Sequence, residues 1–258
     1  APRLLAQGRE LCVLWKPPQW TVSVYDGGEA PPGFEDWRPG GSALALQDWL
    51  REELADGHPI AADPAACHGL VHRLDRNTSG LLLWARSYGA YFEARLMFAA
   101  HRVSKEYACL CHGWPGAAPR AFTAPLQASV EDGQRTSAVS PGGRWARTEA
   151  RGVCHLLGPE NARYSLLALA LHTGRLHQIR VHLADAGHPL AGDGTYGAAS
   201  ARWPRVFLHA WRLRIRLDGA EGELSAECGL AADLQEGLAA LRPADGRAGR
   251  ALRRWLCG

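Results

Sequence analysis

The sequence predicts an α+β fold with a central, mainly antiparallel sheet and flanking helices. Segments with strand character outnumber segments with helical character, and several strands follow one another directly along the chain. A doubly wound parallel sheet would instead need strands and helices that alternate. The sequence contains no G-x-G-x-x-G, no Walker A motif and no repeat of fixed period. Its 258 residues are enough for one large domain with a substantial core.

Two helices and three strands are expected in the first half of the chain. Short apolar runs bounded by turn residues indicate strands, and apolar residues at helical spacing behind a serine indicate capped helices. On the second helix, Tyr91, Phe92, Leu96 and Phe98 are available for burial. The expected elements are, in order, a strand at Leu11–Trp15, a loop at Tyr25–Gly41, a helix from Ser42 to Ala55, a strand at Gly80–Ala85, a helix from Ser87 to Ala100 and a strand at Val103–Cys111.

The second half is expected to be richer in strands. Alternation of apolar and polar residues is strongest between Val206 and Leu217, where Arg212, Arg214 and Arg216 share one face. The expected elements are strands at Thr148–Leu156 and Tyr164–His172, a helix at Leu176–Ala186, a hairpin of Val206–Leu217 with Glu223–Cys228, and a helix at Ala231–Leu241. We therefore expect one catalytic domain over residues 1–242, followed by an Arg-bearing tail at 243–258.

Composition and charge limit the possible classes of protein only moderately. Apolar residues make up 47% of the chain, but no run is long enough to predict a membrane span. The net charge is +3, and all basic residues except Lys16 and Lys105 are arginines. Arginine binds phosphate and stacks on bases, which favours an RNA partner. A GC-rich genome would produce the same excess of Arg, Ala and Gly, so both interpretations stay open.

The seven cysteines predict a reducing, intracellular setting. Their odd number and the absence of a C-x-x-C pair argue against a disulfide framework or a zinc ribbon. Cytoplasm, mitochondrion and plastid are not distinguished by this argument. The chain begins at Ala1 instead of Met, so a preceding segment, including a targeting peptide, stays open.

The segment from His68 to Gly80 is the part of the sequence richest in chemically active side chains. Its central carboxylate, Asp75, lies between Arg73 and Arg76, and nearby cations favour the ionised form of an acid. Thr, Ser and Gly follow and suit a tight polar turn before the next strand. The residue types alone favour an ordinary loop ion pair over a catalytic site.

The run His72-Arg73-Leu74-Asp75-Arg76-Asn77-Thr78-Ser79-Gly80 resembles the H-R-L-D-x-x-T-S-G signature of RluA-type pseudouridine synthases. The resemblance implies that Asp75 is the essential catalytic carboxylate. It also implies the pseudouridine synthase catalytic fold, in which an active-site cleft lies across the central sheet.

Four further segments resemble the same family in order and spacing. They are Lys105-Glu106-Tyr107 (K-x-Y), residues 173–182 (T-G-R-x-H-Q-I-R-x-H), residues 187–197 (G-H-P-I-x-G-D-x-x-Y-G) and Leu208-His209-Ala210 (L-H-A). The resemblance implies that Tyr107 packs against the target base and that Arg180 pairs with Asp75. It places Leu208 near the uracil pocket.

Two features depart from the family pattern. The family opens with K-P-x-G, whereas this chain has Gln19 at the position of the glycine, after Lys16-Pro17-Pro18. The chain also lacks the small S4 RNA-binding domain that many relatives carry in front. RNA selection is then expected from the catalytic domain itself, from sequence outside this chain, or from a partner such as a ribonucleoprotein or the ribosome.

The resemblance implies an RNA pseudouridine synthase that isomerises specific uridines in rRNA or tRNA, with no cofactor and no metal. The target base must leave its stack to reach the pocket. The expected substrate-binding residues are Arg73, Arg76, Thr78, His72, Arg175 and Leu208. Arg73 or Arg76 either fills the gap left by the base or forms a supporting ion pair. With Arg175 and the row Arg212–Arg216, they are expected to form a basic rim.

Three alternative interpretations compete with this one. His172, His177 and His182 invite a metal site, but a spacing of five does not place them on one helical face. A hydrolase would use Asp75 with a histidine, but no G-x-S-x-G motif accompanies them. The third is a catalytically silent synthase-fold subunit of a larger ribonucleoprotein assembly.

Overall fold

The computed structural model describes residues 1–22, 44–116, 118–131, 134–198, 200, 202–217 and 222–257. The chain divides into two compact units. Unit 1 comprises residues 1–103 and 212–227, and unit 2 comprises residues 104–211 and 228–258. The chain passes from unit 2 back to unit 1 within strand β10, Leu208–Arg216.

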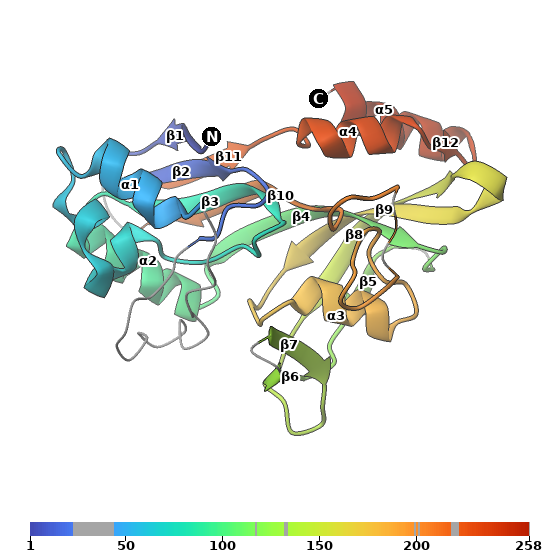
Figure 1. Cartoon of the computed structure of the whole chain (residues 1–258), viewed down its shortest axis with the longest axis horizontal. Coiled ribbons are helices and arrows are strands. Elements are labelled where there is room, and N and C mark those ends of the chain that lie inside the picture. The colour runs from blue at the N-terminus through green and yellow to red at the C-terminus, as the bar shows by residue number, and fades with distance from the viewer. Residues whose placement is uncertain are drawn as a thin grey trace. The chain divides into compact units, whose positions relative to one another are not determined.

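Unit 1 contains a small antiparallel sheet flanked by two helices (Figure 1). Strands β1, β2 and β3 pair in that order, and the second half of β10 pairs with β11. Strand β3 is buried along its whole length, so a continuous apolar run forms the centre of this core. The elements of unit 1 are β1 Arg3–Gln7, β2 Leu11–Lys16, α1 Leu46–Leu54, two 3-10 turns at Pro59–Ala62 and Pro64–Gly69, β3 Ser79–Ala85, α2 Tyr88–Ala99 and β11 Glu223–Glu227.

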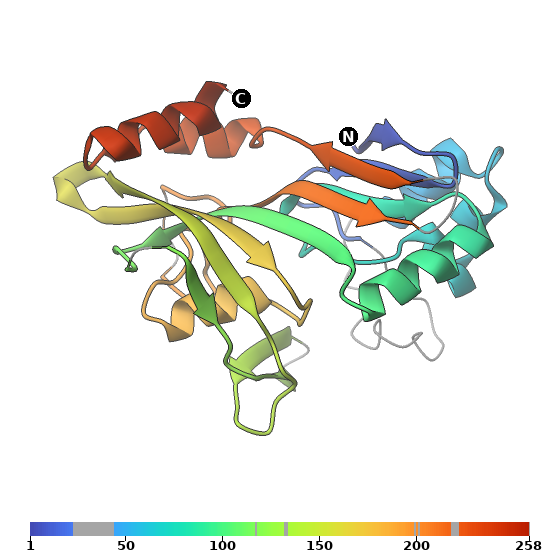
Figure 2. The ribbon, with the colours of Figure 1, turned by 180° about the vertical axis from the view of Figure 1, so that it is seen from behind.

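Unit 2 is built on the antiparallel strands β4, β9, β8 and β12, with β5 also paired to β8. Helix α3 lies on one side of β8 and β9, and α4 and α5 lie on the other side (Figures 1 and 2). The elements are β4 Val103–His112, β5 Arg120–Phe122, β6 Leu126–Glu131, β7 Gln134–Val139, β8 Thr148–Leu157, a 3-10 turn Pro159–Asn161, β9 Arg163–Leu171, α3 Gln178–Asp185, α4 Ala232–Ala239, β12 Arg242–Pro243 and α5 Gly246–Cys257.

The predicted α+β class and the antiparallel arrangement are confirmed. Each strand pair described within the two units is antiparallel. The Ser87 side chain accepts a hydrogen bond from the Ala90 amide at 3.4 Å, so it caps α2 as predicted. The expected loop at Tyr25–Gly41 and the cap at Ser42 lie outside the described residues.

The sequence interpretation missed two kinds of element. The edge strand β1 and the hairpin β6–β7 were not predicted, because their apolar alternation is weak. Most of the expected tail is helix α5. On α2, Phe92 and Leu96 are 62% and 67% exposed, so the prediction that they are available for burial was wrong.

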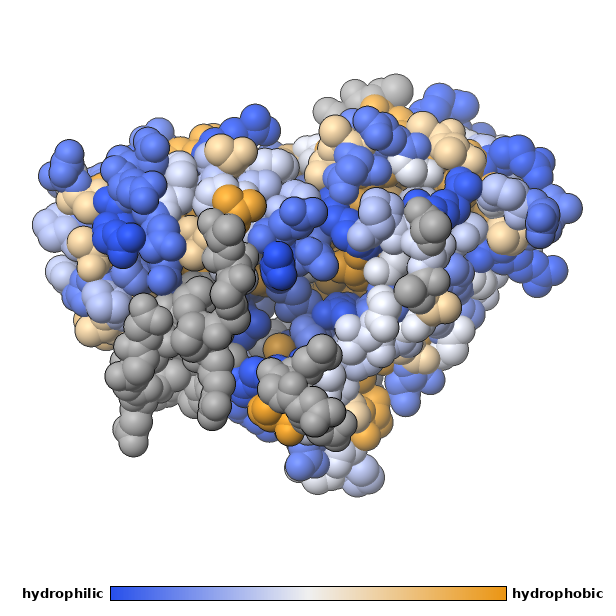
Figure 3. Space-filling view, in the orientation of Figure 1, coloured by the Kyte–Doolittle hydropathy of each residue, from blue (hydrophilic) through white to orange (hydrophobic). Residues whose placement is uncertain are grey.

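Apolar residues on the face shown in Figure 3 occur as separate small patches among hydrophilic ones. In the part of the chain that the structure describes, every helix is too short or too polar to span a lipid bilayer.

Candidate active site

Asp75 lies on a tight turn in unit 1 that is anchored at both ends. The carbonyl of Asp75 accepts a hydrogen bond from the Thr78 amide at 3.0 Å, which closes the turn. Leu74 on one side and Thr78 and Ser79 on the other are 5% exposed or less, whereas Asp75 is only partly buried. The fold therefore holds the backbone firmly and leaves Asp75 partly exposed.

The backbone before this turn is unusually constrained. Cys67, His68 and Gly69 are consecutive residues with positive φ, at 48°, 55° and 77°. A Cβ on Gly69 would lie 2.4 Å from the Ala85 carbonyl oxygen and 2.7 Å from the Trp84 indole nitrogen. The indole N–H in turn donates to the His68 carbonyl at 2.7 Å. Only glycine fits this position, which lets the chain pass close to the end of β3.

Two residues predicted to bind substrate, His72 and Thr78, have structural positions around the turn. The Nε2 atom of His72 accepts a hydrogen bond from the Leu83 amide at 2.9 Å, and its ring stacks on Phe98 at 4.7 Å between centroids. Because Nε2 is the acceptor, the neutral His72 ring carries its proton on Nδ1. Thr78 is 1% exposed. Both residues stay predictions as substrate ligands; His72 contacts the second half of β3, and the Thr78 amide closes the Asp75 turn.

Lys16 supports the turn from the side. Its side chain is fully buried, and Nζ donates to the carbonyls of Pro17, Trp20 and Arg76 at 2.9, 2.9 and 3.1 Å. Three acceptors match the three donors of an ammonium group. Gln19, at the position of the family glycine, has φ 68°, in the left-handed region that glycine adopts freely. The loop therefore reaches the turn despite the missing glycine.

Arg73 and Arg76 differ in exposure. Arg76 is exposed, and its Nε donates to the Gln19 carbonyl at 3.4 Å. Arg73 is partly buried. The exposed head of Arg76 leaves it accessible to RNA, and the choice between stacking and ion pairing stays a prediction for both residues.

In unit 2, Arg180 forms a buried, bidentate ion pair with Asp193. Its Nε and Nη2 atoms donate to the two carboxylate oxygens, each at 2.8 Å. The Asp193 side chain is fully buried and that of Arg180 is 11% exposed. Burial raises the pKa of Asp193, but the hydrogen bonds and charge of Arg180 outweigh this effect and hold the pKa below its usual value.

Tyr196 provides a second support for Arg180. The Arg180 guanidinium lies 4.9 Å from the centre of the Tyr196 ring, within cation–π range. The Tyr196 hydroxyl accepts from the Ser137 amide and is 2.8 Å from Nδ1 of His177, and both contacts fix the ring. The functional roles of Asp193 and Tyr196 were missed, although both lie in the G-D-x-x-Y-G segment. Their separation from Arg180 along the sequence does not predict that they contact it.

The loop before α3 is organised by Gln178. Its Oε1 accepts from the Thr173 hydroxyl at 2.6 Å and from the Arg175 amide at 3.0 Å. Its Nε2 donates to the Arg147 carbonyl and to the Thr148 hydroxyl, both at 3.0 Å. The amide therefore fills all four of its hydrogen-bonding positions and ties the T-G-R segment to the start of β8.

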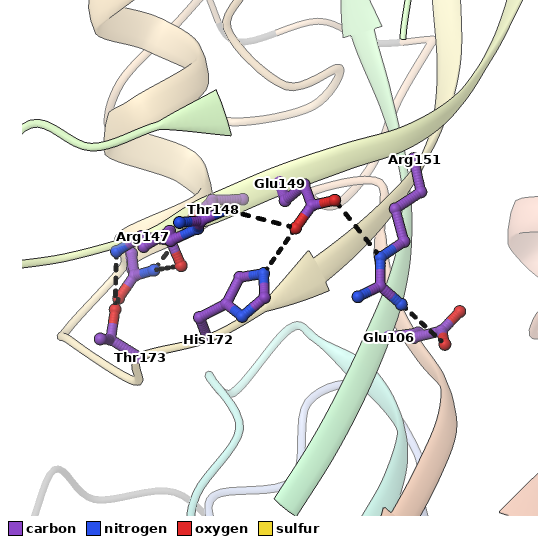
Figure 4. Close-up of polar contacts among 8 residues, drawn as sticks. Glu106, Arg147, Thr148, Glu149, Arg151, His172 and Thr173 are labelled. Atoms are coloured by element: carbon purple, nitrogen blue, oxygen red, sulfur yellow. Dashed lines mark hydrogen bonds and ion pairs between the residues drawn. The ribbon is translucent and has the colours of Figure 1, made fainter. Parts of the chain in front are cut away.

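A network of charged residues lies near the same end of β8 (Figure 4). The Nε2 atom of His172 lies 2.8 Å from Glu149, and Arg151 reaches both Glu149 at 3.7 Å and Glu106 at 3.6 Å. The hydrogen bond from His172, followed by the nearby arginines, lowers the pKa of Glu149. This network explains His172 as a structural partner of a sheet carboxylate.

The remaining predicted residues of unit 2 lie on its strands and loops. Tyr107 is 5% exposed in the middle of β4, opposite Leu169 of β9. Leu208 is 4% exposed at the start of β10. Arg175 is partly buried, and its Nε donates to the Trp145 carbonyl at 3.0 Å. Lys105 lies beside the T-G-R loop, because a Cβ on Gly174 would be 3.7 Å from its Nζ.

The histidines considered for a metal point to different partners. His172 contacts Glu149, His177 contacts Tyr196, and His182 contacts the Thr148 hydroxyl at 3.0 Å and a backbone carbonyl. Within the described ranges, no three His, Cys, Asp or Glu side chains gather as metal ligands would.

The structure thus collects the predicted residues into two sets. The Asp75 turn with His72, Arg73, Arg76 and Thr78 belongs to unit 1. Arg180, Tyr107, Arg175 and Leu208 belong to unit 2. The expected ion pair between Asp75 and Arg180 joins residues of different units and stays a prediction.

Comparison with known proteins shows which protein family the chain belongs to. The model of the RNA pseudouridylate synthase family matches residues 13–185. The chain belongs to this family, which confirms the resemblance found in the sequence.

Individual proteins that are similar to this chain carry names from the same family. An uncharacterized RNA pseudouridine synthase of Chloroflexus aurantiacus is 44% identical over 146 residues, 55% of this chain and 43% of the relative. Ribosomal large subunit pseudouridine synthase D of Zymomonas mobilis is 39% identical over 171 residues, 62% of this chain and 52% of the relative. The solved structure of human RNA pseudouridylate synthase domain-containing 1 is similar with a TM-score of 0.68 and 25% identity, and covers 98% of this chain and 95% of that one.

The chain spans about half the length of the curated relatives it matches, for example 43% and 52% of the two bacterial proteins.

Proposed function

We propose that this chain is an RNA pseudouridine synthase that isomerises specific uridines in rRNA or tRNA, with Asp75 as its catalytic carboxylate. The observation that carries the proposal is the Asp75 turn. Buried neighbours on both sides, a closing hydrogen bond and the Lys16 contacts fix its backbone, while Asp75 itself is partly exposed. A carboxylate on an anchored, partly exposed turn, next to arginines in the sequence, is suited to act on a bound ribose.

The reaction requires no net change of composition. The bond between N1 of uracil and C1′ of ribose breaks, the base turns, and C5 forms a new bond to C1′. The proton lost from C5 is balanced by one gained at N1. Asp75 either attacks C1′ or removes the proton from C2′, and both routes need an ionised carboxylate beside the sugar.

Arg180 and Tyr107 have supporting roles in this proposal. Arg180 would hold and orient Asp75, and Tyr107 would stack on the detached base and limit its movement. The bidentate contact to Asp193 and the stacking on Tyr196 support this role, because they leave the guanidinium little freedom to move. Asp193 is then a positioning residue that acts through Arg180.

The names of the relatives support rRNA as the substrate class, since two of those matched are large ribosomal subunit pseudouridine synthases C and D. A ribosomal precursor or ribonucleoprotein is the corresponding partner in this proposal. We propose an intracellular site of action, in keeping with the absence of disulfides among the six cysteines whose side chains the structure describes.

The test compares Asp75→Asn with wild type. The variant keeps the side-chain shape and removes its charge, so it should fold and bind RNA but form no pseudouridine. Asp56→Asn, at an exposed site of the same unit, is the matched control and should keep full turnover. Wild-type levels of pseudouridine from Asp75→Asn, measured by uridine mapping of rRNA and tRNA transcripts, would reject Asp75 as the catalytic group.

A further inference from the structure

The net positive charge of the chain comes from its C-terminal segment. The chain has 29 basic and 26 acidic residues. Residues 243–258 contain four of the basic residues and one of the acidic ones, so residues 1–242 carry 25 of each and have no net charge. The entire net charge of +3 therefore resides in this segment, which is mostly helix α5.

Helix α5 gathers these charges on one face. Its four arginines, Arg247, Arg250, Arg253 and Arg254, are all exposed. At about 100° per residue they fall within an arc of about 120°, and a rise of about 1.5 Å per residue spreads them over about 10 Å. The only acidic residue of the segment, Asp245, accepts a hydrogen bond from the Ala248 amide at 2.7 Å and caps the helix.

The opposite face of α5 is packed against its own unit. Ala248 and Leu252 are 4% and 6% exposed, and the ring of Trp255 lies edge-on to Trp211 with 5.2 Å between centroids. A basic amphipathic helix binds a membrane by inserting its apolar face into the lipid. Because this apolar face is already buried, only the arginine face of α5 is available to a partner.

The arginines of α5 differ from the other arginine row of the chain. On β10, Arg212 pairs with Glu227 at 2.7 Å, and Arg214 and Arg216 pair with Glu223 at 3.2 Å. The prediction that this row contributes to a basic rim is therefore weakened by glutamates on the adjacent strand. Across the described residues, no carboxylate lies within ion-pair distance of the four α5 arginines. Their charge is available to an external anion.

We propose that the arginine face of α5 is a second RNA-binding surface, which contacts the phosphate backbone of the substrate away from the target uridine. This inference rests on the proposed function and adds a source of RNA affinity outside the catalytic residues. Guanidinium groups bind phosphate through paired hydrogen bonds, and four in a row along one helical face match a polyanion better than a single ligand. Such contacts position the RNA without reading its sequence.

The experiment uses three full-length variants. The first replaces the four α5 arginines with Gln, which removes charge but keeps helix propensity. The second replaces them with Lys, which keeps the charge. The third is a matched control that replaces four other exposed arginines with Gln: Arg3, Arg9, Arg51 and Arg120. Urea unfolding of each variant establishes that it is folded before binding is measured.

The RNA probes are a long large-subunit rRNA transcript and a short stem-loop cut from it around the modified uridine. Affinity for the long transcript is measured over a series of salt concentrations. The Gln variant of α5 should bind it about tenfold or more weakly, and the salt slope should fall by about 3, as expected for four lost phosphate contacts. The Lys variant and the control should stay near wild type. Turnover of the short stem-loop should be unchanged in all variants.

Equal loss of affinity in the two Gln variants would overturn the proposal, because net charge alone would then explain it. So would an α5 Gln variant that binds like wild type. These outcomes are independent of the catalytic proposal. A wild-type protein that forms no pseudouridine on any transcript contradicts the proposed function, while the difference in RNA affinity still tests α5.

Discussion

The Asp75 turn and the Arg180–Asp193 pair are each organised around a buried cation, but in different ways. In unit 1, the Lys16 ammonium donates to three backbone carbonyls and thereby fixes the shape of a loop and a turn. In unit 2, the Arg180 guanidinium binds a buried carboxylate and lies over an aromatic ring. The first arrangement fixes backbone and leaves Asp75 partly exposed, whereas the second fixes a side chain.

Because the two arrangements differ, we expect the carboxylates of Asp75 and Asp193 to have different roles. Asp75 lies on a well-anchored turn and is partly exposed, which suits a carboxylate that acts on a substrate. Asp193 is fully buried and accepts two hydrogen bonds from Arg180 and further ones from the Thr195 and Tyr196 amides. Its charge serves to hold an arginine. Removal of either charge should therefore affect a different property of the protein.

The largest effect on stability is expected from breaking the buried pair. Arg180→Ala leaves the Asp193 carboxylate buried without its cation, which should lower the free energy of unfolding by about 3–5 kcal/mol. Urea denaturation measures this loss. The double variant Arg180→Ala with Asp193→Ala should be less destabilised than the sum of the single variants, because the unpaired charge is gone.

Asp75→Asn is the comparison for this cycle. It should change the unfolding midpoint little and abolish turnover, whereas Arg180→Ala should reduce both. Additive effects of the two substitutions at Arg180 and Asp193 would mean that their contact contributes no coupling, and the positioning role of Asp193 would then fail.

The sequence predicted the two regions unequally. Asp75, Arg180 and Tyr107 were proposed as site residues because short motifs mark them, and their roles stay predictions. The strands β3, β4 and β9 were predicted because apolar runs mark buried strands. The partnership of Arg180 with Asp193 and Tyr196 was not predicted. These contacts depend on how α3 and the following loop fold back on each other, and local spacing carries no information on that.

The tail was misjudged for a related reason. Between Gly246 and Cys257 four arginines and two glycines are interspersed with the apolar residues, so the helical pattern was overlooked. Burial of Ala248 and Leu252 against unit 2 stabilises a helix that its glycines would otherwise weaken.

A smaller effect on stability is expected at Lys105, one of only two lysines in the chain. Burial, and then the positive charge of Arg175, lower its pKa to about 8. Below this pH the folded protein bears the cost of a desolvated ammonium, and the cost disappears as the pH rises from about 8 to about 10.4, the value of an unfolded lysine. Lys105→Met should therefore raise the free energy of unfolding by roughly 1–3 kcal/mol at pH 7 and by less at pH 9.5.

Lys16→Met is the matched control, because it makes the same change at the other lysine. It leaves three carbonyls without their buried donor and should lower the free energy of unfolding. Urea denaturation of both variants at the two pH values measures these changes in the free energy of unfolding. A gain at Lys105→Met that does not shrink with rising pH would show that burial of the charge is not its origin.

The smallest effect is expected at Gln19, where the chain departs from the K-P-x-G pattern. A side chain at φ 68° costs the folded state about 1–2 kcal/mol relative to glycine, because its Cβ crowds the following carbonyl. Glycine in turn loses more conformational entropy on folding, by about 0.5–1 kcal/mol. Gln19→Gly should therefore raise the free energy of unfolding by less than about 1 kcal/mol, with turnover unchanged. Gln235→Gly, inside α4, is the control with ordinary helical backbone and should lower it by about 1 kcal/mol. If both glycine variants were destabilised alike, the left-handed backbone at Gln19 would not be a source of strain, and the Lys16 contacts alone would account for the shape of the loop.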